Sequence, residues 1–164
     1  MTTRNLLDVI KKLLNCKQSD IAEKAGWESW KLVQRMSKET LRVPELFELL
    51  DANDIKMQVR IREIGKTYTI KRDENGVATS RSVLESALKP MHKTKAFAAR
   101  SIDWYPMLLE QRLLRDTLKC EDLLRMWEAI GVDVILINAK TGEVAELERE
   151  RKQEIGRASC RERV

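Results

Sequence analysis

The chain has 164 residues, of which 43% are hydrophobic, 35% are charged and only 5% are aromatic. With six glycines and three prolines it has too few turn residues for an all-β sandwich, so the composition favours a helical globular protein. The formal net charge of +5 favours a polyanionic partner but does not by itself require one.

No apolar stretch reaches the length of about 18 residues that a membrane span requires, and residues 1–15 are amphipathic, unlike a signal peptide. The cysteines, Cys16, Cys120 and Cys160, lack metal-ligand spacing, and their odd number suits a reducing compartment. We therefore expect a cytoplasmic protein with no membrane segment, no metal and no small-molecule cofactor.

The sequence repeats itself at an offset of 77 positions. Aligned without a gap, residues 2–76 and 79–153 are identical at 15 of 75 positions. Unrelated chains of this composition would give about a third of that number. The identical pairs include Ala22 with Ala99, Trp27 with Trp104, Gln34 with Gln111 and Arg35 with Arg112. The repeat predicts two copies of one unit, in residues 1–76 and 77–153.

The segment after the second copy, residues 154–164 (EIGRASCRERV), has no apolar period. It resembles the conceptual translation of a sequencing-library adapter, so we expect it to be non-native or disordered. How the natural chain continues beyond Gln153 stays open.

Helical periodicity predicts four helices in the first copy: an amphipathic helix capped by Thr3, then Gln18–Ala25, Ser29–Lys38 and Pro44–Ala52. Alternating apolar residues in Met57–Ile61 then predict a strand, and a turn at Gly65 predicts a hairpin.

The second copy repeats this order. Ser80 is the expected N-cap of its first helix, and Pro90 is expected to end that helix early. The further helices are expected at Lys95–Ile102, with Phe97 and Ala98 facing inward, at Pro106–Arg115 and at Glu121–Ile130. A strand around Val134–Asn138 and a turn at Gly142 complete the unit.

The stretch Gln18–Ile61 carries a family resemblance. A short helix with a small inward residue, Ala22, precedes the turn glycine Gly26, a second helix, a leucine-rich helix (ELFELLDANDI) and a strand (KMQVRI). This order resembles the Cro/phage-repressor (Xre-like) helix-turn-helix proteins. The resemblance implies a protein that is mainly α with short β-hairpins, built as two tandem helix-turn-helix units. It also implies a transcription regulator of bacterial or phage origin.

The residue types have physical reasons of their own. Alanine lets two crossing helices approach, and glycine supplies the positive φ of a tight turn. The chain also departs from the pattern, because Lys17 stands where Ser or Thr normally caps the short helix. In the second copy Asp103 replaces the turn glycine, and aspartate tolerates a positive φ better than most residues.

Candidate DNA-binding residues lie on the predicted helix Ser29–Lys38 and its repeat, with Leu32, Val33 and Met36 expected to face inward. Gln pairs with adenine and Arg or Lys with guanine in the major groove. Gln18 begins the preceding helix, where a phosphate would be favoured. Trp30 suits either a thymine methyl group or the core. The candidates are Gln18, Ser29, Trp30, Lys31, Gln34, Arg35, Lys38, Gln111, Arg112 and Arg115.

The second copy's equivalent helix is apolar nearly all round, which is typical of a buried helix. It is therefore expected to pack against the first unit or another chain, and its contact with DNA stays open. The residues responsible are Met107, Leu108, Leu109, Leu113 and Leu114.

The expected partner is double-stranded DNA, bound by a homodimer or by an intramolecular pseudo-dimer whose copies pair through Met57–Ile61 and Val134–Asn138. The alternative is a helix-turn-helix scaffold that binds a protein, such as an antitoxin-like or phage accessory factor. Catalysis is not expected, because His92 is the one histidine and no H-E-x-x-H, P-loop or G-x-G-x-x-G motif occurs.

Overall fold

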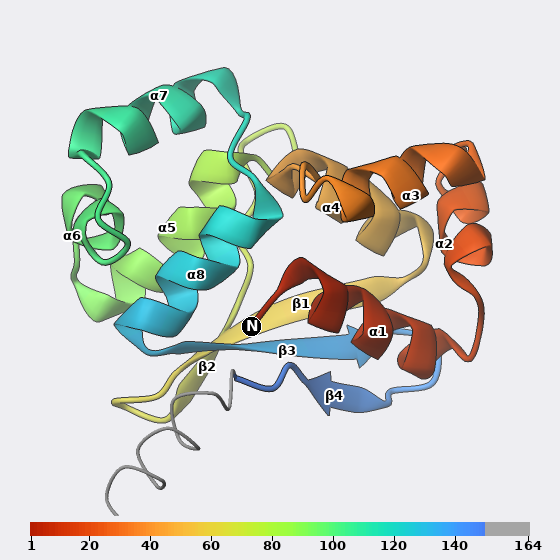
Figure 1. The fold of residues 1–164 in the computed structure, drawn as a ribbon. Coiled ribbons are helices and arrows are strands. Elements are labelled where there is room, and N and C mark those ends of the chain that lie inside the picture. The colour runs from red at the N-terminus through yellow and green to blue at the C-terminus, as the bar shows by residue number, and fades with distance from the viewer. Residues whose placement is uncertain (150–164) are drawn as a thin grey trace, which may run out of the picture.

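The computed structural model describes residues 1–149, which form a helical layer on one face of an antiparallel sheet (Figure 1). The chain begins with four helices and two strands: α1 (Thr3–Leu14), α2 (Gln18–Lys24), α3 (Ser29–Ser37), α4 (Val43–Ala52), β1 (Ile55–Ile61) and β2 (Lys66–Thr69). The same order follows with α5 (Ser80–Met91), α6 (Lys95–Arg100), α7 (Pro106–Arg115), α8 (Cys120–Ile130), β3 (Val132–Asn138) and β4 (Val144–Glu146). The prediction of a mainly helical protein with short hairpins is confirmed. The expected non-native tail, 154–164, lies outside the described residues.

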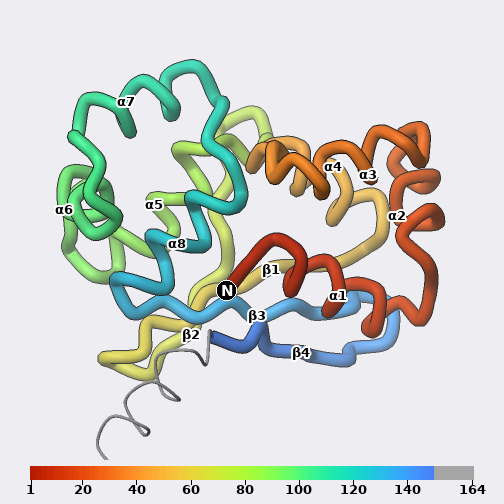
Figure 2. The backbone as a smooth tube through the Cα atoms, viewed as in Figure 1, coloured from red at the N-terminus to blue at the C-terminus, as the bar shows by residue number. Residues whose placement is uncertain are grey.

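The two copies share one sheet, with strand order β2-β1-β3-β4. Strand β1 pairs antiparallel with β3 along its whole length, as Figure 2 shows near the middle of the molecule. Gln58 faces Ile135 in this pairing, and these residues are equivalent in the repeat. An antiparallel pairing centred on equivalent residues relates the copies by a pseudo-two-fold axis, as in a symmetric dimer. The expected pairing of the copies through these strands is confirmed.

A second contact lies on the same axis. The backbone N–H of Val43 donates to the carbonyl of Leu118 over 2.9 Å, and that of Cys120 donates to the carbonyl of Leu41 over 2.8 Å. These two bonds exchange equivalent partners, because each pair of positions differs by the 77-residue offset. The pseudo-symmetry therefore extends from the sheet to the opposite side of the helical layer.

The copies are also interwoven in the core. Helix α1 packs on β3 and β4 of the other copy, and α5 packs in return on β1 and β2. Leu6, Leu84 and Trp127 are among the side chains that are fully buried. Cys120 is buried as well, and burial raises the pKa of its thiol. Each copy therefore completes the core of the other.

Three local predictions are wrong. Thr2 and Thr79 cap α1 and α5 in place of Thr3 and Ser80, because their hydroxyls accept the N–H groups of Asn5 and Ser82. Pro90 does not shorten α5, because it lies in the last turn and removes only one helical hydrogen bond. Phe97 is exposed while Ala98 and Ala99 are buried, because Phe97 lies at the outward position equivalent to Asp20 and the two alanines are equivalent to the buried Ile21 and Ala22.

Candidate nucleic-acid interface

The same turn joins α2 to α3 and α6 to α7. The N–H of Trp27 donates to the carbonyl of Ala22 over 2.9 Å, and the N–H of Trp104 donates to that of Ala99 over the same distance. Both alanines are fully buried, where they let the two helices cross closely. Both copies thus join their third helix, α3 or α7, to the preceding helix through the same hydrogen-bonded turn.

The turns differ in the residue at positive φ. Gly26 has a φ of 77°, and Asp103 adopts 61° at the equivalent position. The expected left-handed conformation of Asp103 is therefore confirmed. Lys17 provides no side-chain cap for α2, although the Asp20 carboxylate accepts the N–H of Lys17 over 3.1 Å. In the second copy Thr94 caps α6 by accepting the N–H of Phe97.

Helix α3 presents an outer face made by Trp30, Gln34 and Ser37, which are spaced at i, i+4 and i+7. All three are exposed, and Trp30 is 60% accessible. This exposure decides the question that the sequence left open for Trp30, which does not pack in the core. Val33 was expected to face inward and is instead 56% exposed, because Leu32 and Met36 already fill the buried stripe.

Two basic candidates of the first copy have partners within the protein. The Lys31 ammonium lies 4.0 Å from the centre of the Trp27 ring, and Lys31 is half-buried. The Arg35 guanidinium nitrogen Nε donates to the Glu45 carboxylate over 3.2 Å. Ser29 and Lys38 are exposed at the two ends of α3, and Gln18 is half-buried at the start of α2.

Helix α7 is not buried, contrary to expectation. Leu109 and Leu113 face the core, but Met107 and Leu114 are 71% and 77% exposed. A helix packed on one side buries only one stripe of side chains, so the remaining apolar residues of α7 project outward. Met107, Gln111 and Leu114 form the outer face of α7, at positions equivalent to Trp30, Gln34 and Ser37.

The charged residues of α7 separate into paired and unpaired groups. Arg81 of α5 donates to the Glu110 carboxylate over 2.9 Å and thereby lowers the pKa of Glu110. Arg112 and Arg115 are exposed, and neither forms an ion pair with another residue in the described range 1–149.

The pseudo-two-fold axis brings both outer faces to the same side of the molecule. Helices α3 and α7 lie on either side of the α4 and α8 region, away from the sheet (Figure 1). Sequence reasoning missed the two cations closest to this axis, Arg42 and Lys119. Their backbones pair as an antiparallel β-bridge between the copies. The signal was present in the sequence, because both copies carry a cation at this position.

No protein-family model matches the chain, and comparisons with curated proteins and with solved structures give no match either. Among residues 1–149, no helix is long and apolar enough to cross a membrane. The same residues contain no group of three or more His, Cys, Asp or Glu side chains placed to hold a metal ion.

Proposed function

We propose that the protein binds double-stranded DNA through α3 and α7, each acting as the second helix of a helix-turn-helix motif. The observation that carries this proposal is the pseudo-two-fold relation between the two outer faces. Proteins of the Cro/phage-repressor kind place two such helices in successive major grooves, about 34 Å apart. A single chain with two related helices would supply both halves of that arrangement in the cytoplasm, as a transcription regulator.

Three features of the outer faces support base contact. Gln34 and Gln111 are exposed at equivalent positions, and glutamine pairs with adenine through two hydrogen bonds. Trp30 and Met107 precede them by one turn, where an apolar side chain would contact a thymine methyl group. Arg112, next to Gln111, is exposed and has no ion pair among the described residues, although its charge acts on Asp122. Arg35 is bound to Glu45, so we assign it a positioning role in place of base contact.

The faces also differ, so we expect an asymmetric operator. Ser37 on α3 is replaced by Leu114 on α7, and Lys31 is replaced by Leu108. The half-site bound by α7 should therefore depend more on thymine methyl contacts than the half-site bound by α3.

Fluorescence anisotropy of the full chain with random-sequence duplex DNA tests this function. Between 50 and 200 mM salt, we expect the affinity to fall by at least about a hundredfold, because several phosphate contacts release counterions. An operator is then selected from the random pool. On that operator, Gln34→Ala/Gln111→Ala should weaken binding by at least about tenfold, with little effect on random DNA. Asn75→Ala, which removes an exposed amide elsewhere, is the matched control.

A second candidate function has its own support. Tyr105, Met107 and Leu114 leave an exposed apolar surface at α7, which suits a protein partner of the antitoxin or phage-accessory kind. Absence of DNA binding by the wild-type chain at 50 mM salt would overturn the regulator proposal in favour of this one.

A further inference from the structure

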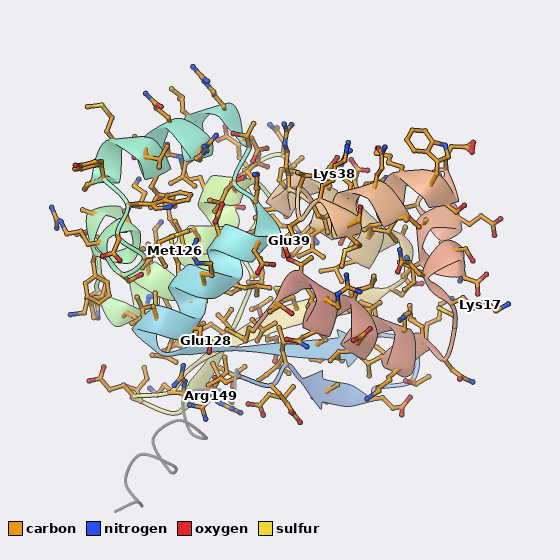
Figure 3. All side chains as sticks on the ribbon, viewed as in Figure 1. Lys17, Lys38, Glu39, Met126, Glu128 and Arg149 are labelled. Atoms are coloured by element: carbon orange, nitrogen blue, oxygen red, sulfur yellow. The ribbon has the colours of Figure 1, made fainter. Side chains whose placement is uncertain are left out.

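Four cations gather around the pseudo-two-fold axis between α3 and α7. Lys38 directly follows α3 and Arg115 is the last residue of α7, while Arg42 and Lys119 directly precede α4 and α8. Figure 3 shows Lys38 between the two outer helices. The backbone β-bridge between Arg42 and Lys119, with the backbone hydrogen bonds on either side of it, keeps these residues of the two copies close together. We call Lys38, Arg42, Arg115 and Lys119 the axial cluster.

The axial cluster is not neutralised within the described residues. All four side chains are exposed, and none of them has an ion pair or a side-chain hydrogen bond within residues 1–149. Glu45 is paired with Arg35 and also accepts the N–H of Arg42 over 3.1 Å. Asp116 accepts the N–H of Ser80 over 2.7 Å and keeps its negative charge. Glu39 beside Lys38 and Asp116 beside Arg115 add two negative charges against the four positive ones, so the region keeps an excess of positive charge (Figure 3).

Asp122, the counterpart of Glu45 in the second copy, is also engaged. It accepts a hydrogen bond from Arg125 over 3.2 Å. Burial raises the pKa of Asp122, while the charges of Arg125 and Lys119 oppose that shift. The carboxylate therefore lies near Lys119 but is bound to a different cation.

Helix stability does not account for the cations at the axis. Arg42 and Lys119 occupy the N-cap positions of α4 and α8 and make no side-chain capping bond there. The N-terminus of a helix carries partial positive charge, and Ser, Thr, Asp or Asn is preferred at the cap. Both copies nevertheless carry a cation at this unfavourable position, so these two charges do not contribute to helix capping.

We propose that the axial cluster binds the phosphates of duplex DNA midway between the two half-sites. The inference rests on the proposed function and adds a sequence-independent contact to it. Outer faces related by the axis would engage DNA on both sides, so the axis itself would meet the centre of the site. Cations there would hold the central phosphates without reading a base.

The test uses the full-length variant Arg42→Ser/Lys119→Ser and random-sequence duplex DNA. Serine is a good N-cap, so thermal unfolding should occur at the wild-type temperature or above it. The slope of log affinity against log salt should become shallower by about 1.8, because each lost phosphate contact contributes about 0.9. The matched control Lys66→Ser/Lys71→Ser removes two exposed cations beside the sheet and should keep the wild-type slope.

Each other outcome overturns the inference in a distinguishable way. An unchanged slope in the Arg42→Ser/Lys119→Ser variant, with DNA still bound, refutes the axial contact and leaves the proposed function standing. An equal loss in both variants shows a general effect of net charge and also refutes it. Absence of binding by the wild-type chain refutes the proposed function and the axial contact together.

Discussion

Helices α3 and α7 occupy equivalent places on either side of the pseudo-two-fold axis, yet their outer faces differ in polarity. Each face has a large apolar side chain followed by glutamine, but the third residue of the face is Ser37 on α3 and Leu114 on α7. The buried side of the two helices differs much less, since Leu32 and Leu109 are both fully buried. The two copies thus share their packing while their exposed residues differ, so a difference in binding between them would come from the outer faces.

The largest effects are expected where the copies share a core. Leu50 and Trp127 are equivalent and are both at most 1% exposed. Trp127→Ala should lower the free energy of unfolding by about 3–5 kcal/mol, and Leu50→Ala by about 2–5 kcal/mol. Because α1 packs on β3 and α5 on β1, both variants should unfold in one cooperative transition.

Calorimetry of the two variants checks this prediction. Two transitions, of which Leu50→Ala shifts only one, would show that the halves fold independently. One shifted transition in each variant would show that neither half is a stable unit alone.

A smaller effect is expected where β1 and β3 differ in charge. Asp133 is 2% exposed and is bound by Arg60 over 2.9 Å and by Arg62 over 3.1 Å. Its equivalent in the repeat, Lys56, is exposed. Asp133→Ala should lower the free energy of unfolding by about 2–3 kcal/mol. This is less than the loss expected on breaking a fully buried ion pair, because both arginines are half-exposed. Lys56→Ala should stay within about 0.5 kcal/mol of wild type.

Urea denaturation of both variants measures the difference. Equal unfolding midpoints would mean that the arginines interact with Asp133 without stabilising the fold.

The turns before α3 and α7 differ in how much strain each residue carries. Nothing lies within 4 Å of a Cβ built on Gly26, so Gly26→Ala would cost only the left-handed backbone, about 1–2 kcal/mol. Asp103→Gly would relieve about 1 kcal/mol of backbone strain in the folded state. Glycine also raises the conformational entropy of the unfolded chain, which offsets about 0.4–1 kcal/mol of that gain. We therefore expect a clear loss for Gly26→Ala and a change below about 0.5 kcal/mol for Asp103→Gly. Thermal unfolding of both variants checks the two turns, and equal losses would contradict the comparison.

These comparisons show what the sequence could predict. The 77-residue repeat predicted the order of the elements in both copies, because buried positions such as Trp27 and Leu46 must be kept for the same packing. Pairing through β1 and β3 was also predictable, since equivalent apolar strands follow the fourth helix of each copy, alternating in β1 and nearly continuous in β3. Helix-end errors at Thr2 and Pro90 were of one to a few residues, because propensity does not decide which hydroxyl forms the cap.

The candidate site was less predictable. Periodicity places Arg35 on the outward side of α3, but the Glu45 carboxylate that binds it comes from the next helix. The axial cluster needed the contact between the copies, which joins residues 77 positions apart. Which side chains remain unpaired depends on such tertiary neighbours, and a helical pattern contains no information about them.

The smallest effects on stability are expected from exchanging one residue between the two outer faces. This exchange also tests the comparison of α3 with α7 most directly. Leu114→Ser gives α7 the residue of α3, and Ser37→Leu gives α3 the residue of α7. Both positions are exposed, so each change should alter the free energy of unfolding by less than about 0.5 kcal/mol.

If α7 contacts thymine methyl groups, Leu114→Ser should weaken binding to the selected operator by about fivefold, equivalent to about 1 kcal/mol. Footprinting should show the protection weakened in one half-site only, and Ser37→Leu should affect the other half-site. Weakening of both half-sites by Leu114→Ser alone would contradict the assignment of one face to each half, whereas unchanged protection would assign the apolar surface of α7 to a protein partner.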